Sequence, residues 1–118
     1  MQKTEIPSSV SAELDKAGGL RHVSRLIPGE GRLRGVSKVF QALSEPLRLS
    51  ILYALSATPL CVCLLRSIIR LADSKLSYHL SQLRSCGLIN QRSEGKFLVY
   101  DITPLGRHML SVCDRISL

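Results

Sequence analysis

This chain lacks long apolar runs. None of its 118 residues belong to an apolar stretch of about 18 residues, the length that a membrane-spanning helix needs. The N-terminus also lacks the apolar core of a secretory signal peptide. These absences predict a cytoplasmic protein with no membrane partner. The four cysteines are then expected to be mostly thiols rather than structural disulfides.

Catalytic signatures and acidic residues are also scarce. The sequence has no Ser/His/Asp grouping, no glycine-rich phosphate loop and no paired carboxylates at a usable spacing, so an enzyme is the least favoured class. Nine Asp and Glu stand against sixteen Lys and Arg, which gives a net charge of +7. This balance favours a polyanionic partner, with nucleic acid first.

The length of 118 residues suits one domain with a modest core. A core of this size gains from a subunit interface, so a dimer is expected. Helix-start and break signals divide the chain into short elements. Gly18-Gly19 interrupts a first helical pattern, and 28–31 is a clear break. Pro46, Pro59 and Pro104 each follow a potential cap and stand at a predicted first helical position.

The expected helices have different surroundings. The one that starts at Thr58-Pro59 and runs to Ile69 is apolar over most of its circumference and is predicted to be well buried. The last one, after Thr103, carries its own apolar stripe, which predicts contact with a partner subunit, with packing on the domain's own core as the alternative. The stripe comprises Leu105, Met109, Val112, Cys113 and Ile116.

A helix after Asp73 has the character of a DNA-recognition helix. Leu76, Leu80 and Leu83 fall at i, i+4 and i+7 and share one face. The other faces carry short polar and cationic side chains, which suit base edges and phosphates in a major groove. Asp73 or Ser74 is the expected cap. The residues outside the leucine face are Ser74, Lys75, Ser77, Tyr78, Ser81, Gln82 and Arg84.

Two strand-like runs follow the glycine that ends this helix, Gly87. Residues 88–92 and 97–102 are joined by a four-residue turn containing Gly95, which predicts a hairpin. An ordinary amphipathic helix is the alternative to a recognition helix, and the hairpin argues against it. The order of elements predicts a mainly α fold with a two-stranded β-hairpin wing, a winged helix-turn-helix.

Several segments carry a family resemblance. They are 40–49, 60–63, 77–83, 87–89 and 95–100, and together they span roughly residues 36–102. This set resembles the arsenic-repressor (ArsR/SmtB) family of winged helix-turn-helix regulators. The resemblance implies a homodimer held by its first and last helices, which binds an imperfect palindrome in double-stranded DNA and leaves it when an inducer binds.

The resemblance assigns roles along the chain. Residues 1–35 are expected to form an arm with a dimer contact, 36–102 the DNA-binding domain and 103–118 a dimerisation helix. It adds His79 and Lys96 to the DNA contacts, although His79 donating to a backbone carbonyl and Tyr78 packing on the wing are alternatives. The predicted DNA contacts are Ser74, Lys75, Ser77, Tyr78, His79, Gln82, Arg84 and Lys96.

Cys61 and Cys63 are the candidate inducer site. On an undistorted helix they project about 200° apart, so binding one ion requires the first turn to distort. With Thr58 as cap, Cys61 lies near the positive end of the helix dipole, which favours its thiolate. Thiolates suit arsenite, antimonite or copper(I). The alternative is that both cysteines pack as small hydrophobic residues.

The sequence departs from the family's arsenic site, because Arg66 stands where a third thiol is usual. Cys113 is the candidate third ligand across the dimer interface, with simple packing as the alternative, and Cys86 is expected to be structural. Paired Asp/His clusters typical of zinc sensors are not evident. The predicted function is a repressor that needs no cofactor to bind DNA and is released by As(III) or Sb(III). A redox-responsive regulator, one without a metal response, and a protein-interaction module are the alternatives.

Overall fold

The computed structural model describes residues 5–118, which form two compact units that divide between Arg34 and Gly35. The first unit contains α1 (Ser8–Lys16), α2 (Gly19–Arg25) and the beginning of α3 (Glu30–Leu43). Gly18 and Gly19 have φ values of 100° and 87°, a conformation that glycine adopts at little cost. The predicted interruption at these glycines is therefore confirmed.

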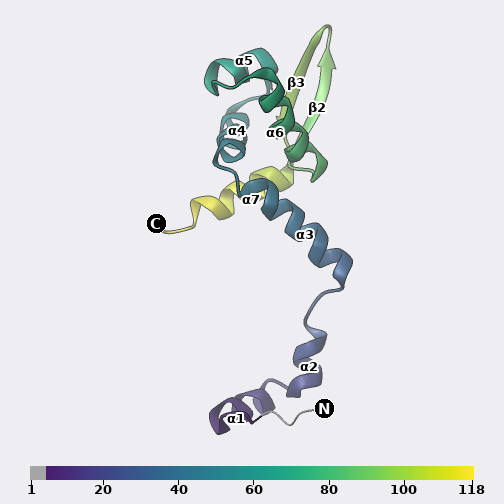
Figure 1. The fold of residues 1–118 in the computed structure, drawn as a ribbon, viewed down its shortest axis with the longest axis vertical. Helices are drawn as coiled ribbons and strands as arrows, with labels where there is room; N and C mark the ends of the chain where they lie inside the picture. Colours follow the sequence, from purple (N-terminus) through teal and green to yellow (C-terminus); the bar gives the residue numbers. More distant parts are fainter. Residues whose placement is uncertain (1–4) are drawn as a thin grey trace. The chain divides into compact units, whose positions relative to one another are not determined.

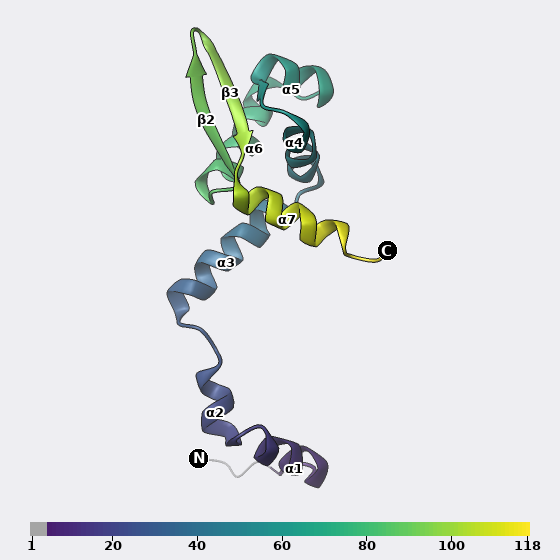
Figure 2. The same ribbon diagram turned by 180° about the vertical axis from the view of Figure 1, so that it is seen from behind.

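The second unit is a winged helix-turn-helix, as predicted. Its helices and strands follow one another in the expected order (Figures 1 and 2). One short strand, β1 (Leu60–Cys61), is additional. After α3, the elements are α4 (Pro46–Ala57), β1 (Leu60–Cys61), α5 (Val62–Ile68), α6 (Asp73–Ser85), β2 (Ile89–Glu94), β3 (Phe97–Ile102) and α7 (Pro104–Asp114).

The core of this unit is aliphatic and centres on α4 and α6. The predicted face of α6 is confirmed, because Leu76 and Leu83 are fully buried and Leu80 is 2% exposed. Burying one such side chain stabilises a fold by about 1.5–3 kcal/mol. The fully buried large side chains of α4, α5, the residue before β2 and the first residue of β2 complete the core: Ile51, Leu52, Leu55, Leu65, Leu88 and Ile89.

The wing is a hairpin of β2 and β3 with a shorter turn than predicted. Glu94 pairs with Phe97, so only Gly95 and Lys96 form the turn. Gly95 has a φ of 58°, which suits the tight two-residue loop. A charged network extends the pairing, because Arg92 on β2 contacts Asp101 on β3 as well as Glu94. The predicted four-residue turn is therefore wrong.

The sheet gains a third strand that the sequence pattern did not predict. Leu60 pairs with Tyr100 and Cys61 with Val99, so β1 adds to the outer edge of β3. This pairing holds the chain extended through Cys61, and the helix begins at Val62 instead of just after Thr58. The prediction that Thr58 caps this helix is wrong, since Cys61 is the N-cap residue of α5 and Thr58 follows the last residue of α4.

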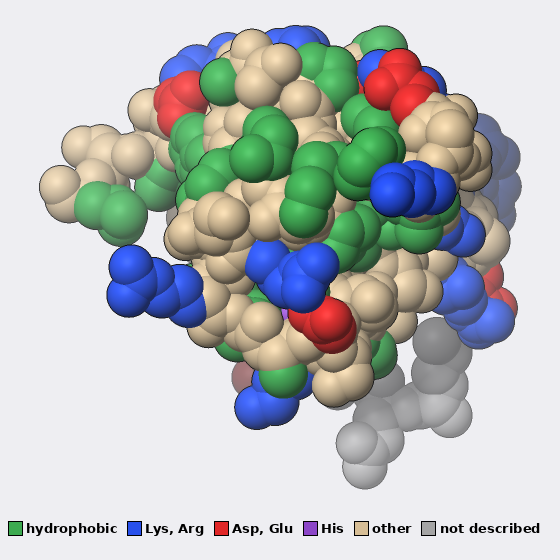
Figure 3. Space-filling view, turned by 90° about the horizontal axis from the view of Figure 1, so that it is seen from above, with side chains coloured by type: hydrophobic (Ala, Val, Ile, Leu, Met, Phe, Trp, Pro, Cys, Tyr) green, Lys and Arg blue, Asp and Glu red, His purple; other side chains and the backbone are tan. Residues whose placement is uncertain are grey.

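The predicted burial of α5 is also wrong for this chain. Leu65 is fully buried, but Leu64 and Ile68 are 51% and 58% exposed. Phe97 on the wing is exposed as well. Figure 3 shows hydrophobic side chains grouped on the face that α5 and the wing present, with lysines and arginines around them. Only the side of α5 that carries Leu65 is packed on the core.

The helix ends show which capping predictions hold. Glu45 caps α4 by accepting from the Leu47 amide at 3.4 Å. Thr103 Oγ1 accepts from the Gly106 amide at 3.0 Å and donates to the Gly87 carbonyl at 2.6 Å, which joins α7 to the end of α6. Ala72 occupies the N-cap position of α6 without a side-chain bond, so the predicted Asp73 or Ser74 cap is wrong.

The predicted start of the second helix also needs correction. α3 begins at Glu30 rather than near Val36, and Arg34 pairs with Glu30 at 2.6 Å one turn away. Within residues 5–118, no helix is both long and apolar enough to cross a membrane.

The apolar stripe of α7 divides between the core and the surface. Met109 is buried together with Leu110 and Gly106, whereas Leu105 is 39% exposed and Ile116 lies beyond the helix. Packing on the domain's own core therefore accounts for only part of the stripe. At the far end of the helix, Tyr53 on α4 donates to Asp114 at 2.6 Å, and this bond raises the pKa of Tyr53 to about 12.

We predict that Gly106→Ala destabilises the protein by about 1–3 kcal/mol, because overpacking strains a filled interior. A Cβ at this position would overlap the Leu88 carbonyl oxygen and lie 2.6 Å from Ile102 Cγ1. Gly35→Ala is the matched control, since α3 has open space there and alanine favours a helix by about 0.5–1 kcal/mol. Urea unfolding of both variants checks this; equal stability of the two would contradict it.

Candidate nucleic-acid interface and thiol site

The outer face of α6 presents most of the predicted DNA contacts to solvent. Ser74, Lys75 and Ser77 are exposed, and the Tyr78 side chain is 56% exposed. The three buried leucines anchor the opposite face, so the orientation of α6 is fixed by the core. Four of the predicted residues are thus available together on the first two turns of one anchored helix.

His79 lies at the border of this face and is half-buried. Its Nδ1 accepts a hydrogen bond from Arg48 Nε on α4 at 3.1 Å. The same guanidinium lies 5.5 Å from the centre of the Tyr78 ring, within cation–π range. The alternatives in which His79 bonds a carbonyl and Tyr78 packs on the wing are therefore not the arrangement found.

Sequence reasoning assigned no role to Arg48. The residue belongs to one of the segments that carry the family resemblance, but nothing in its local pattern places it beside a helix 31 positions further along the chain. One feature of the sequence could have pointed to Arg48, because it is a cation within the otherwise apolar start of α4. A half-buried arginine at such a position needs a polar partner.

The wing turn and the N-terminal half of α6 border one open hollow. Lys96 and Ser77 line one hollow of about 370 Å³, together with Asp73 and both candidate cysteines. Lys96 Nζ lies 5.9 Å from the Phe97 ring centre. A helix that presents hydroxyls beside a wing cation combines groups for base edges with a charge for a phosphate.

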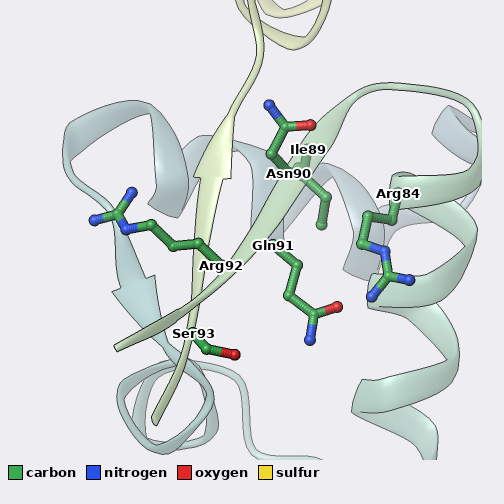
Figure 4. Close-up of a pocket in the computed structure, with 6 residues that line it drawn as sticks. All are labelled: Arg84, Ile89, Asn90, Gln91, Arg92 and Ser93. Atoms are coloured by element: carbon green, nitrogen blue, oxygen red, sulfur yellow. The ribbon is translucent and has the colours of Figure 1, made fainter. Parts of the chain in front are cut away.

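Arg84 occupies a different place. It faces β2 across an open hollow of about 460 Å³, and Figure 4 shows its side chain and that of Gln91 extending into the same space. Gln82 is half-buried and lines a third hollow beside Arg48. The structure therefore groups Lys96 with Ser77 but separates both from Arg84. Sequence reasoning missed the polar β2 side chains of the Arg84 hollow, Asn90, Gln91 and Ser93.

Cys61 and Cys63 are brought together by the bend from β1 to α5. Cys61 belongs to the strand and Cys63 to the first turn of the helix, so the expected divergence of about 200° does not apply. Both line a hollow of about 500 Å³ bounded by Arg92, Glu94 and Phe97 of the wing. Cys63 is exposed and Cys61 half-buried.

The two thiols differ in acidity. Hydrogen bonding with Cys63 lowers the pKa of Cys61, and the backbone amides at the start of α5 lower it further. The same thiol–thiol hydrogen bond raises the pKa of Cys63, and desolvation adds to this rise. The expectation that Cys61 favours the thiolate has the same direction here, although its first cause is the neighbouring thiol rather than a helix dipole.

The other cysteines lie apart from this pair. Cys113 is half-buried on α7, and Cys86 donates to the Gln82 carbonyl at 3.4 Å, where burial raises its pKa. Among residues 5–118 of one chain, no three His, Cys, Asp or Glu side chains come close enough to hold one metal ion. A third ligand from Cys113 would therefore have to come from a second subunit.

Part of this chain matches a known protein family. Residues 45–91, from the start of α4 to β2, match the family described as bacterial regulatory protein, arsR family. The arsenical resistance operon repressor of Bacillus subtilis is 39% identical over 71 residues, which cover 59% of this chain and 68% of that protein. The chain belongs to the arsR family. This is a family of DNA-binding regulators and not of enzymes.

Two further relatives extend the comparison. A cadmium resistance regulatory protein CadC homolog of Staphylococcus aureus is 41% identical over 68 residues, which span 57% of this chain but only 56% of that protein. A structure described as the homodimeric winged helix-turn-helix DNA-binding domain of a Mycobacterium bovis protein is 28% identical, with a TM-score of 0.64. It covers 71% of this chain and 82% of that one.

We predict that Cys61 is alkylated faster than Cys63 or Cys86 near neutral pH, because only its pKa is lowered and the thiolate is the nucleophile. Cys63→Ala, which removes the hydrogen-bond donor to the Cys61 thiolate, should slow the alkylation of Cys61. Iodoacetamide labelling followed by peptide mass spectrometry measures each rate. Cys86→Ser is the control and should leave the rate at Cys61 unchanged.

Proposed function

We propose that this protein is a homodimeric transcriptional repressor that binds an imperfect palindrome in double-stranded DNA. The observation that carries the proposal is the anchored α6 helix, which exposes Ser74, Ser77 and Tyr78 and whose Ser77 shares a hollow with the wing cation Lys96. Hydroxyls and a phenol reach base edges, while a lysine contacts phosphate. The net charge of +7 supports a polyanionic partner.

Unpaired apolar surface supports the homodimer. Leu105 and Ile116 at the two ends of the α7 segment are exposed, and α3 exposes Val36 and Phe40. Such side chains on a small domain favour a subunit interface. The Mycobacterium bovis relative is described as homodimeric. A two-fold pair presents two recognition helices, which matches two half-sites of a palindrome.

Arsenite or antimonite is the proposed inducer, and Cys61 and Cys63 are its ligands. The bend between β1 and α5 turns both cysteines toward one open hollow, and soft thiolates prefer such ions. Arsenous acid would exchange two of its hydroxyls for the two sulfurs, and each leaves as water with a thiol proton. Relatives named for arsenical and for cadmium resistance both exist. A trivalent metalloid is favoured over cadmium, because the site offers two sulfurs and the partner's Cys113 could supply a third.

The route from inducer to DNA follows the backbone. Cys61 pairs with Val99 on β3, and β3 continues into the wing turn that carries Lys96. A ligand that pulls Cys61 and Cys63 together changes the β1 edge of this sheet. The same thiols share a hollow with Ser77 of α6. Binding there therefore alters the wing and the start of α6 at once.

A redox-responsive repressor is the second candidate. The lowered pKa of Cys61 supports it, since an oxidant attacks the thiolate and Cys63 stands close enough to resolve the product. A regulator without a metal response and a protein-interaction module remain the further alternatives. The exposed polar face of α6 favours DNA over the last of these.

We predict that Ser77→Ala weakens specific DNA binding by about 1–3 kcal/mol if its hydroxyl reads a base. Lys96→Met should weaken binding to all sequences alike and reduce the salt dependence, because the lysine contacts phosphate. Fluorescence anisotropy at several salt concentrations, with operator and random duplexes, measures both. Ser67→Ala, an exposed serine on α5 that donates to the Cys63 carbonyl, is the control. Parental operator affinity of Ser77→Ala would show that the reading face is misassigned.

We predict that arsenite releases the parent protein from DNA and that the double variant Cys61→Ser, Cys63→Ser keeps its DNA affinity but does not respond. Serine preserves size and removes the soft ligand. Cys113→Ser should weaken the response without abolishing it, and Cys86→Ser should leave it unchanged. Titration under reducing conditions measures release. Unchanged release in the double variant would refute the site, and no release of the reduced parent would favour the redox or metal-blind regulator.

A further inference from the structure

The hydrogen bond between Arg48 and His79 defines the protonation pattern of the histidine. Arg48 Nε donates to His79 Nδ1 at 3.1 Å. A guanidinium has only donors and stays charged in proteins, so Nδ1 must be an acceptor without a proton. The imidazole is then neutral and carries its proton on Nε2. One contact with α4 thus decides which ring nitrogen of a recognition-helix residue is a donor.

Arg48 itself is held in place. It is half-buried, its Nη1 reaches the Ala42 carbonyl at 3.5 Å, and its guanidinium lies 5.5 Å from the centre of the Tyr78 ring. These contacts join the end of α3, the first turn of α4 and the second turn of α6. Because the guanidinium is planar and contacts several groups, its Nε–H has a defined direction toward His79.

The other ring nitrogen of His79 has no hydrogen-bond partner among residues 5–118 and is not fully buried. No side-chain partner of Nε2 is found, and residues 5–118 contain no buried side-chain nitrogen or oxygen that lacks a hydrogen bond. Nε2 is therefore accessible to solvent. Its neighbours Tyr78 and Lys75 are exposed on the same helix, so the donor belongs to the border of the proposed reading face.

We propose that Arg48 is a positioning residue that fixes His79 as an Nε2–H donor, and that His79 thereby selects hydrogen-bond acceptors on base edges. This inference rests on the proposed DNA-binding function. In the major groove, those acceptors are guanine N7 and O6, adenine N7 and thymine O4, whereas the amino groups of cytosine and adenine offer only donors. A contact of His79 to phosphate is the competing outcome of the test.

The tautomer is tested by nitrogen NMR on the full-length protein, which has only three histidines. We expect a proton on His79 Nε2 and a scalar coupling between Arg48 Nε and His79 Nδ1 across the hydrogen bond. Arg48→Lys should abolish the coupling while keeping the charge. Arg34→Lys is the matched control, because Arg34 pairs only with Glu30 in α3. A proton on Nδ1 in the parent protein would overturn the proposal.

Base selection is tested by two substitutions of His79 that differ in where they place an amide. In His79→Gln the amide nitrogen can occupy the place of Nε2, whereas in His79→Asn it stays near Nδ1. We expect His79→Gln to keep operator affinity within about twofold and His79→Asn to lose about tenfold, the value of one good base contact. Replacing each acceptor base pair in turn should remove this difference at one position only.

The outcomes separate the two levels of inference. Equal operator affinity of His79→Gln, His79→Asn and the parent would overturn the role of His79, while the repressor proposal stands. An equal loss for operator and random DNA would indicate a phosphate contact and would also overturn it. If the parent protein does not distinguish operator-like palindromes from random DNA, the repressor proposal itself fails.

Discussion

The burial of the leucine face of α6 is the constraint on which the DNA-binding unit depends. Leu76 and Leu83 are fully buried and Leu80 nearly so, and together they press the helix against α4 and β2. Shortening one such side chain to alanine typically costs about 2–5 kcal/mol. Because the leucine face is buried in the core, the opposite face of α6 is exposed to solvent. The face proposed to read DNA is therefore exposed as a consequence of how the core packs.

The sequence predicted what periodicity and capping can reveal. Leucines at helical spacing gave the buried face of α6, and Glu45-Pro46 and Thr103-Pro104 marked two helix starts that the structure confirms. It failed at β1, because a two-residue strand has no period of its own. Pairing with β3 holds Leu60 and Cys61 extended, and that pairing joins residues far apart in sequence. The Thr58-Pro59 start signal was overridden by this tertiary contact.

The candidate site was predictable in its members but not in its geometry. The residue types identified the serines and Tyr78 of α6 and the two thiols as candidates. Whether the two thiols lie together, however, depends on the residue at which α5 begins. Moving that start to Val62 turns a diverging pair into neighbours and gives Cys61 a thiol partner. Arg48 was missed for a similar reason, since only the packing of α4 against α6 brings it to His79.

Gly106 has a consequence for the spacing of the two recognition helices in a dimer. The absence of a side chain lets the first turn of α7 rest directly on the Leu88 carbonyl, and Thr103 ties the same turn to the Gly87 carbonyl that follows α6. The helix proposed for dimerisation and the helix proposed for reading are thus joined at one rigid corner. In a dimer paired through α7, this contact would fix the distance between the two α6 helices. The separation of the two DNA half-sites would then be set by helix pairing and not by a flexible linker.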